Sequence, residues 1–563
     1  MRSPRVPALA LLALVLSAIA LSAQAPRGPR LIVMLVVDQL RPDYLDRHPE
    51  HLTGGFRRLL DRGAVYEEAA YPYLNTVTCA GHATIGTGAL PFRHGMILNT
   101  WYDRSTRAGT SCTHDPAVKD ISYHGVAGNP HSGHRLLVPT LADRLREGAR
   151  GRVVSISLKA RSAIGMAGRG GDVVAWFDER GGFHSSTAYG RRPSPILQRF
   201  FERNPITADH GRTWERLLPA DAYSGADDVE FEQPPAGWTR TFPHRLGTPG
   251  EKLTGDFYPQ WTRSPYADEY LARMAAETSD ALKLGRGRGI DVLAVGFSSL
   301  DMLGHGFGPE SHEVQDFVLR LDRTIARLLD HLDKTVGPDN YVLALSSDHG
   351  VAGIPEITPG GGRHTAADLR AAIDAAIEPF FGPPPAPAAA AGSAPGRSSY
   401  LAYSGYTDLY LADGVMERLR RDRKALAAVL EALRALPGIS HAFNGDDLVP
   451  AEARTVEDPA MRAAALNYHP GRSGDLIVVP RVHWILSTGA TTHGTLHPYD
   501  QRVPVIFYGA GVASGRYQTA ATPADIAPTL AALARVPPSL TDGRVLQEAV
   551  APVPERRVVP PPR

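Results

Sequence analysis

The feature that most constrains the fold is a set of short runs that are apolar at every position rather than at every second one. The clearest is Leu31–Val37, which reads LIVMLVV. A strand that is apolar on both sides has to be covered on both faces, as happens in parallel sheets with helices packed above and below. Similar runs recur along the chain, at Val153–Leu158, Val173–Phe177, Val292–Phe297, Tyr341–Leu345, Leu476–Val479 and Val503–Tyr508.

Helical patterns lie between these runs. The clearest spans Ser311 to about Val336, where apolar side chains recur at i, i+3, i+4 and i+7. Ser311 can cap its start, and Gly337-Pro338 ends it. This alternation predicts an α/β fold with a mostly parallel central sheet and helices on both of its faces.

Two regions interrupt the alternation. Residues 184–265 are rich in proline, glycine, aromatic and charged residues, and residues 379–399 form a low-complexity stretch of proline and alanine. We interpret both as the sites of inserted cap segments, at about 184–265 and 379–475, on one catalytic domain that covers residues 26–550. Residues 551–563 are expected to form a Pro-rich tail.

The N-terminus is typical of a secretory signal peptide over residues 1–25. It has a basic start, an apolar run from Ala8 to about Ala20 and a small-x-small end at Ala23-Gln24-Ala25. The alternative is a membrane anchor, for which the run is short of the ~20 residues that a span needs. We therefore expect a periplasmic or secreted protein without stable membrane association.

Composition excludes several classes of function. The 563 residues include 60 Lys and Arg against 59 Asp and Glu, so the net charge of +1 gives no support for binding nucleic acid through a broad basic surface. Two cysteines exclude a disulfide-scaffold protein and a four-thiolate metal site. Cys79 and Cys112 form either one disulfide or two buried free thiols, and the sequence leaves both open.

Polar side chains follow four of the predicted strands, at the edge of an open α/β sheet where ligands bind. One such residue alone is more often a helix cap or a turn former. Four placements in register indicate a site. They are Asp38 after the first run, Lys159 and Arg161 after the second, Asp301 and His305 after the fourth, and Asp348 with His349 after the fifth.

The same residues have the chemistry of metal ligands. Asp301 and His305 are spaced i, i+4, so on a helical turn they share one face and can hold one metal ion. Asp348 and His349 supply another oxygen and nitrogen, and His493 adds a further imidazole. Carboxylates and imidazoles without thiolates suit zinc, with manganese or iron as alternatives.

Thr78 lies where an irregular segment enters a helical one (CAGHATI). A threonine at that position is commonly an N-cap, worth about 1 kcal/mol. The functional interpretation is a nucleophile, because a helix N-terminus favours a bound anion and a metal ion can activate a hydroxyl that is otherwise a weak nucleophile.

Taken in order, these motifs resemble those of the alkaline phosphatase superfamily. More narrowly, they resemble its branch with a threonine nucleophile, which contains nucleotide pyrophosphatases/phosphodiesterases and monoesterase-type alkaline phosphatases. The resemblance covers roughly residues 31–535. The motifs that carry it are Asp38, Thr78-x-x-x-His82, Pro91-x-x-His94-Gly95, Asp301-x-x-x-His305, Asp348-His349-Gly350 and His493-Gly494.

The resemblance implies a catalytic centre with two Zn²⁺ ions and a phosphothreonine formed on Thr78. It implies that His82 and His94 are structural. By the same resemblance, one zinc ion is held by Asp301, His305 and His493, and the other by Asp38, Asp348, His349 and the Thr78 oxygen.

The substrate class follows from a balance of charge. In that centre the charges of two zinc ions, three carboxylates and a threonine alkoxide cancel, so the two negative charges of a phosphate monoester call for two more cations. Lys159 and Arg161 supply them, if an extended segment places both on one face. In the similar alkaline phosphatases an Asn, a Lys and an Arg bind phosphate, which implies the same role for Asn99 here. We therefore predict a phosphomonoesterase that acts on small phosphate esters, with secondary phosphodiesterase activity.

Two alternatives remain at this point. One is a nucleotide phosphodiesterase or pyrophosphatase of the same superfamily. The other is a metal-binding protein without catalytic activity, although no nucleophile or ligand is missing. A sulfatase is disfavoured, because Cys79-Ala80-Gly81-His82-Ala83 lacks the Cys-x-Pro-x-Arg motif of those enzymes. The oligomeric state is not determined.

Overall fold

The computed structural model describes residues 28–148, 150–250, 252–384, 398–537 and 541–551. The expected signal peptide lies outside these residues, as do the middle of the low-complexity stretch and almost all of the expected tail. Among the helices of the described residues, none combines the length and the apolar character that a membrane crossing requires.

A ten-stranded sheet forms the centre of the molecule, which confirms the predicted α/β fold. Its middle is parallel, as register pairs such as Leu31 with Asp291 and Leu31 with Tyr341 show. The parallel strands, in spatial order, are β12 (Tyr341–Ser346), β1 (Leu31–Val37), β11 (Asp291–Phe297), β6 (Val153–Ser157) and β7 (Val173–Asp178).

Antiparallel pairing extends the sheet on both sides. β19 (Val505–Gly509) runs antiparallel to β12, so the Val503 run is a strand of the central sheet. The other outer strands are β2 (Ala64–Tyr66) beyond β19, with β20 (Gly515–Tyr517) parallel to it, and β8 (Gly182–Ser186) and β5 (Asp120–Ser122) beyond β7.

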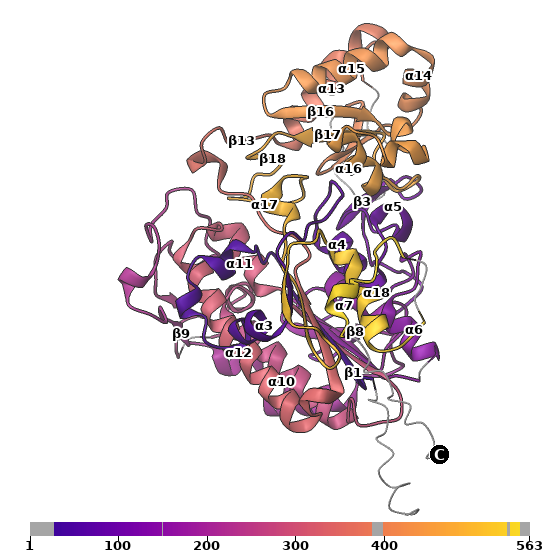
Figure 1. The fold of residues 1–563 in the computed structure, drawn as a ribbon. Coiled ribbons are helices and arrows are strands. Elements are labelled where there is room, and N and C mark those ends of the chain that lie inside the picture. The colour runs from indigo at the N-terminus through magenta and orange to yellow at the C-terminus, as the bar shows by residue number, and fades with distance from the viewer. Residues whose placement is uncertain (1–27, 149, 251, 385–397, 538–540, 552–563) are drawn as a thin grey trace, which may run out of the picture.

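Both faces of the sheet are buried, as the two-sided runs predict. In β1 the side chains of Leu31, Val33, Leu35 and Val37 belong to one apolar cluster, and the alternate side chains belong to another. The first face is covered by α3 (Gly55–Arg62), α10 (Pro265–Leu282), α11 (Ser299–Phe307) and α12 (His312–Thr335); the second by α4 (Thr78–Thr87), α6 (Leu141–Gly148), α7 (Ala160–Ala167) and α18 (Ile526–Leu533) (Figure 1). Ser311 caps α12 by accepting a hydrogen bond from the Val314 amide at 3.2 Å, as predicted.

The first interrupted region, residues 184–265, which we call the first insertion, packs on the body of the molecule. Its large aromatic side chains, among them Trp214, Trp238 and Trp261, belong to the same apolar cluster as β1 and α12. Its elements are α8 (Pro195–Arg203), β9 (Thr213–Trp214), β10 (His244–Arg245) and α9 (Phe257–Thr262).

Residues 366–480 form a separate lobe, seen above the body in Figure 1. It has an antiparallel four-stranded sheet and an apolar cluster of its own, and a second cluster joins it to Leu74 of the body. The prediction that the Leu476–Val479 run belongs with the central strands is wrong, because β17 pairs within the lobe. Its elements are α13 (Ala366–Phe381), β14 (Leu401–Gly405), β15 (Asp408–Leu411), α14 (Val415–Arg421), α15 (Arg423–Ala435), β16 (Ile439–Asn444), α16 (Pro459–Asn467) and β17 (Leu476–Pro480).

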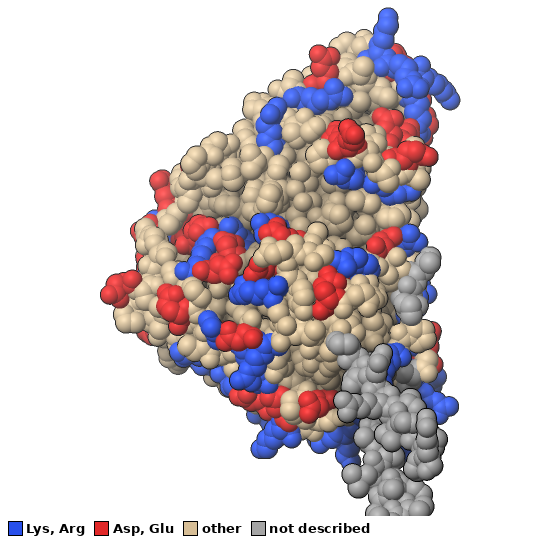
Figure 2. Space-filling model, in the orientation of Figure 1, with Lys and Arg blue, Asp and Glu red and all other residues tan. Residues whose placement is uncertain are grey.

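Short elements connect these parts. They are α2 (Asp43–Asp46), α5 (Pro91–His94), β3 (Thr100–Asp103), β4 (Ala108–Ser111), β13 (Gly362–Arg363), β18 (Trp484–Ile485) and α17 (Pro498–Gln501). Figure 2 shows acidic and basic side chains intermixed over the visible face of the body, in line with the nearly balanced charge of the sequence.

Candidate active site

The predicted site residues meet at the carboxyl ends of the parallel strands. Asp38 directly follows β1, and Asp348 follows β12 by two residues. Asp301 lies in the first turn of α11, which begins two residues after β11 ends. All three carboxylates are almost completely buried, so each needs a charged or hydrogen-bonding partner.

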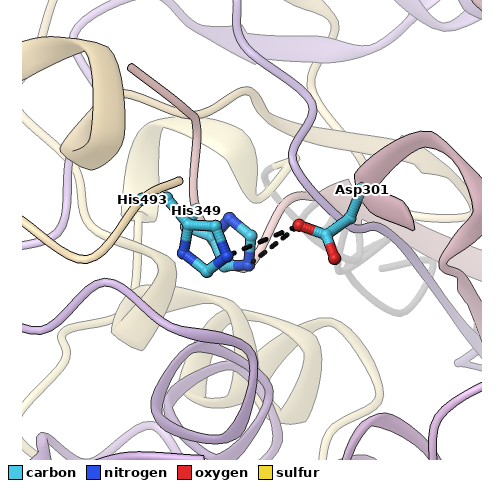
Figure 3. A group of neighbouring side chains, drawn as sticks. All are labelled: Asp301, His349 and His493. Atoms are coloured by element: carbon cyan, nitrogen blue, oxygen red, sulfur yellow. Dashed lines mark ion pairs between the residues drawn. The ribbon is translucent and has the colours of Figure 1, made fainter. Parts of the chain in front are cut away.

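One group of possible metal ligands consists of Asp301, His349 and His493 (Figure 3). Its ligand atoms lie within 4.8 Å of one another. The imidazole rings of His349 and His493 stack with their centroids 3.4 Å apart, and both Nε2 atoms face the Asp301 carboxylate. His305 completes this side, with its Nε2 3.3 Å from Asp301 Oδ1.

The second group consists of Asp38, His82 and Asp348. His82 Nε2 lies 3.3 Å from Asp38 Oδ1, and His82 Nδ1 lies 3.4 Å from Asp348 Oδ2. His349 lies between the two groups, because its Nε2 is 3.1 Å from Asp348 Oδ2 and 3.9 Å from Asp301 Oδ1.

His82 is one of three site neighbours that the sequence argument did not place at the site. The signal for His82 was its i+4 spacing from Thr78 on one helix. Gln39 follows Asp38 and donates from Nε2 to Asp301 Oδ1 at 2.8 Å and from its backbone amide to Asp348 Oδ1 at 3.2 Å. Asp500 accepts from the backbone amide of Gly494, directly after His493, at 3.0 Å.

Backbone carbonyls orient three of the proposed ligand imidazoles, and for His349 the contact is from Nδ1 to the Gly350 carbonyl oxygen at 2.9 Å. His305 Nδ1 lies 3.1 Å from the Thr491 carbonyl oxygen, and His493 Nδ1 lies 2.8 Å from the Thr76 carbonyl oxygen. A hydrogen bond at Nδ1 fixes the tautomer and leaves Nε2 as the ligand atom. Burial also lowers the pKa of His493 well below its ordinary value, so this imidazole is neutral, as a metal ligand must be.

Thr78 is the first residue of α4 and is 1% exposed. It does not act as a helix cap, since Val77 occupies the N-cap position and Thr78 Oγ1 has no hydrogen-bond partner among the described residues. The helix packs closely on the Asp348 segment at Gly81, where an added Cβ would lie 2.3 Å from the Asp348 carbonyl oxygen. The glycine therefore allows the hydroxyl and the carboxylate to share one site.

Several site atoms are buried without a hydrogen-bond partner in the part of the chain that the structure describes. They are Thr78 Oγ1, Asp38 Oδ1, Asp348 Oδ2 and His349 Nε2. Buried polar atoms are normally paired, so this set fits a centre completed by cations. The donors are oxygen and nitrogen only, which suits zinc and similar metals.

Lys159 lies between the two groups. Its Nζ lies 2.8 Å from Asp38 Oδ2 and also forms an ion pair with Asp301 Oδ2, so one ammonium group contacts both carboxylates. Burial alone would raise the pKa of Asp301, but the Lys159 ammonium and the His305 imidazole outweigh it and hold that pKa well below the ordinary value. The Asp301 carboxylate is therefore held ionised next to a fixed cation.

The other two expected phosphate-binding residues lie at the same edge. Asn99 precedes β3, and its Oδ1 accepts from the Cys79 backbone amide at 2.8 Å, next to Thr78. Arg161 is the second residue of α7, with a buried Nε that has no partner among the described residues. The expectation of an extended Lys159–Arg161 segment is wrong, because α7 begins at Ala160 with Lys159 as its N-cap residue.

A disulfide joins Cys79 to Cys112, which decides the alternative that the sequence left open. Both sulfur atoms lie in an apolar cluster with Met96, Leu98 and Trp101.

Comparisons with known proteins agree with this geometry. The profile of the family described as type I phosphodiesterase / nucleotide pyrophosphatase matches residues 32–500. The chain is 30% identical to alkaline phosphatase PhoV of Synechococcus elongatus over 93% of this chain and 94% of the relative. It is 31% identical to alkaline phosphatase PafA of Elizabethkingia meningoseptica over 93% of this chain and 94% of the relative.

Solved structures show the same likeness. A crystal structure of wild-type alkaline phosphatase PafA superposes with a TM-score of 0.82 at 29% identity, covering 94% of this chain and all of that one. A solved PafA variant, with the same TM-score and coverage, carries substitutions of one threonine, one asparagine, one lysine and one arginine.

Proposed function

This chain belongs to the type I phosphodiesterase / nucleotide pyrophosphatase family, and from that premise we propose that it hydrolyses phosphate monoesters through a phosphothreonine on Thr78. The observation that carries the proposal is the Thr78 hydroxyl, which is buried and unpartnered among the described residues at the start of α4. The helix N-terminus favours the negative charge of a phosphoryl group at this point.

The residues present fit two metal ions, and we propose zinc. Asp301, His305 and His493 would hold one ion, and Asp38, Asp348, His349 and the Thr78 oxygen the other. When bound, such ions supply Lewis-acid stabilisation of the attacking and leaving oxygens. His82 contacts both Asp38 and Asp348 and is a further candidate ligand or a residue that orients them.

The reaction has two displacements at phosphorus. In the first, a bond forms between Thr78 Oγ and phosphorus, the hydroxyl proton is released, and the bond from phosphorus to the alcohol oxygen breaks. The alcohol takes up a proton and leaves. In the second, a water oxygen bonds to phosphorus, the bond to Thr78 Oγ breaks, and a proton returns to the threonine.

Three side chains are proposed to bind the phosphoryl group. Lys159 supplies a charge between the two ligand groups, and Arg161 supplies a planar fork suited to two phosphate oxygens. Asn99 keeps its Nδ2 amino group for a third oxygen, because its Oδ1 is already used by Cys79. The solved PafA variant, with a threonine, an asparagine, a lysine and an arginine replaced, supports the choice of these four residue types.

We also propose that the protein is exported. The support is the basic, apolar and small-residue pattern of residues 1–25, together with the Cys79–Cys112 disulfide, which is typical of proteins that fold in an oxidising compartment.

The nucleophile is tested by Thr78→Ala, with Thr78→Ser as the matched variant that keeps a hydroxyl. We expect phosphate release from phenyl phosphate to fall at least a thousandfold in Thr78→Ala and to persist in Thr78→Ser, with zinc still bound in both because Asp38, Asp348 and His349 remain as ligands. Normal turnover by Thr78→Ala would refute the mechanism. If the wild-type protein bound zinc but released no phosphate, it would be a metal-binding protein without catalytic activity.

The substrate class is tested by the Lys159→Ala/Arg161→Ala pair. We expect this pair to lose far more activity on phenyl phosphate than on its phosphodiester counterpart, because the diester carries one negative charge less. The matched control is Arg420→Ala, which removes a guanidinium whose partner, Asp446, lies in the lobe. Equal losses on both substrates, with a faster wild-type rate on the diester, would favour a phosphodiesterase.

A further inference from the structure

The disulfide lies directly beside the proposed nucleophile. Cys79 follows Thr78 in the first turn of α4, and Cys112 follows β4, the second strand of the β3–β4 hairpin. These are the only two cysteines of the sequence. The bond therefore ties the start of the nucleophile helix to the hairpin that Asn99 precedes.

Both cysteines also hold Asn99 through their backbone amides. The Cys79 amide donates to Asn99 Oδ1 at 2.8 Å, and the Cys112 amide donates to the Asn99 carbonyl oxygen at 3.0 Å. The two hydrogen bonds and the disulfide form a closed ring around this one residue. An amide N–H can pair only with the oxygen of the carboxamide, so the ring dictates which way the side chain is turned.

We propose that the Cys79–Cys112 disulfide is a positioning element for Asn99. It fixes the carboxamide relative to Thr78, so that the Asn99 amino group faces the phosphoryl oxygens that the nucleophile attacks. This inference rests on the proposed function of Thr78 and Asn99 and adds a device to it. The disulfide touches neither substrate nor metal in this account and acts only through Asn99.

Burial argues for a permanent device rather than a redox switch. Cys79 is 2% exposed and Cys112 is fully buried. A reductant in solution cannot reach either sulfur without local opening of the hairpin, and reactive disulfides are usually accessible ones. Once the bond is broken, Asn99 keeps the two hydrogen bonds from backbone amides and the β3–β4 pairing of Thr100 with Ser111, and the start of α4 is no longer covalently tied to the hairpin.

The test is a double-mutant cycle on the full-length zinc enzyme. It compares Asn99→Ala, the Cys79→Ala/Cys112→Ala pair, and all three substitutions together, using kcat/KM for phenyl phosphate. We expect the cysteine pair to lose about tenfold, Asn99→Ala to lose at least as much, and the triple variant to lose less than twofold beyond Asn99→Ala. Multiplied losses in the triple variant would overturn the proposal, since the disulfide would then act independently of Asn99.

Leu136→Ala is the control that distinguishes a loss of packing in this cluster from a loss of the position of Asn99. Leu136 packs in the same apolar cluster as both cysteines, but its aliphatic side chain cannot hydrogen-bond to Asn99. We expect it to lower the melting temperature, and its small effect on kcat/KM to multiply with that of Asn99→Ala. The same sub-additivity for Leu136→Ala would overturn the proposal.

The experiment also has a defined outcome if a cysteine-pair variant does not fold. If the alanine pair does not fold, the Cys79→Ser/Cys112→Ser pair, which is closer in volume, enters the same cycle. If neither pair folds, the bond is a requirement for folding and the proposal is overturned. Wild-type turnover is measured first, so an inactive wild type would refute the proposed function and not this inference.

Discussion

The first insertion and the lobe interrupt the same α/β pattern, but they are joined to the body in different ways. Trp214, Trp238 and Trp261 of the first insertion lie in the apolar cluster of the central sheet. The lobe instead packs side chains such as Leu369, Leu409 and Val429 in a cluster of its own. The first insertion is therefore part of the body's core, whereas the lobe has a core of its own and meets the body through smaller buried contacts, such as Tyr410 beside Cys79 and Ile477 beside Leu74.

One contact of the lobe is with the segment that precedes the proposed nucleophile, Thr78. Asp408, at the start of β15, accepts from Asn75 Nδ2 at 3.0 Å, and Thr407 donates to Asn75 Oδ1 at 2.5 Å. Asn75 is three residues before Thr78. We therefore expect changes at the seam, where α12 contacts the first insertion, to lower the free energy of unfolding. Changes at the lobe's contacts with the body should instead lower kcat/KM.

The largest effect is expected for Asp316→Ala, at the seam between α12 and the first insertion. Buried Asp316 accepts from Trp214 Nε1, the Leu217 amide and the Tyr223 hydroxyl, each at 2.6 Å. Its loss removes the acceptor of the Trp214 and Tyr223 donors and the ion-pair partner of Arg320, which should lower the free energy of unfolding by about 4 kcal/mol. Urea unfolding measures this, and kcat/KM of the folded variant should stay within about twofold of wild type.

The control for this prediction is Asp330→Ala on the same helix. Its side chain is 77% exposed and pairs with Arg58, so its loss should cost less than about 1 kcal/mol. If Asp316→Ala lowered kcat/KM strongly without changing the unfolding curve, the first insertion would be coupled to the site and the contrast with the lobe would fail.

Glu313→Gln tests the same seam through the pH dependence of the free energy of unfolding. Glu313 is fully buried, with Oε1 2.7 Å from His244 Nε2, and burial raises the pKa of Glu313 to about 8. Burial and the neighbouring Glu313 raise the pKa of Glu232 to about 9, so the first insertion and α12 place two carboxyls close together. Raised pKa values mean that the folded state keeps protons which the unfolded state has already released.

Wild-type stability therefore falls as pH rises from the ordinary glutamate pKa of about 4.5 to about 8, and then levels off. The glutamine side chain of the variant has no proton to lose, so Glu313→Gln should gain about 3 kcal/mol relative to wild type between pH 5 and pH 8. Urea unfolding at several pH values measures the difference, with Glu310→Gln, whose side chain is 65% exposed, as the matched control. A constant difference across this range would contradict the prediction.

Asp408→Asn tests the lobe's contact with the nucleophile segment. Asp408 Oδ2 accepts from Asn75 and Oδ1 accepts from the Gly474 amide, so an asparagine must face one of these donors with a donor of its own and weakens the hold on the segment before Thr78. We expect kcat/KM to fall about tenfold, or about 1.4 kcal/mol. The control is Asp413→Asn, an exposed lobe residue that pairs with Arg107. Equal kcat/KM for both variants would show that the lobe does not position the nucleophile.

Local patterns predicted the fold and most of the site, because the strands and the residues at their ends are set by short stretches of sequence. The two-sided run of Leu31–Val37 is buried on both faces, and Asp38, Asp301 and Asp348 meet as expected. The pairing of the Leu476 run was not predictable, since a five-residue apolar strand does not specify its neighbour. Long-range contacts were equally hidden, as Asn75 and Asp408 are 333 residues apart.

The smallest effect is expected at the loop that carries His493. Arg363 of β13 pairs with both oxygens of Glu356 at 2.7 Å. From the same guanidinium, Nη1 donates to the carbonyl oxygens of Ser487 at 3.0 Å and Gly489 at 2.6 Å. One planar side chain thus holds the loop a few residues before His493.

Arg363→Lys keeps the positive charge but removes the fork, since an ammonium cannot donate to the carboxylate and both carbonyls in this geometry. The loop also contains Thr491, whose carbonyl oxygen accepts a hydrogen bond from His305 Nδ1. A looser loop should therefore weaken the binding of the zinc ion proposed for Asp301, His305 and His493. We expect zinc to be lost to a chelator about threefold faster, less than the 10–100-fold typical of partners that touch a ligand directly. Restored activity on adding zinc would show that the loss is of metal and not of fold. Unchanged zinc loss would show that the loop is held without Arg363, and the influence of the outer parts of the chain on the site would then rest on contacts of the lobe such as Asp408 with Asn75.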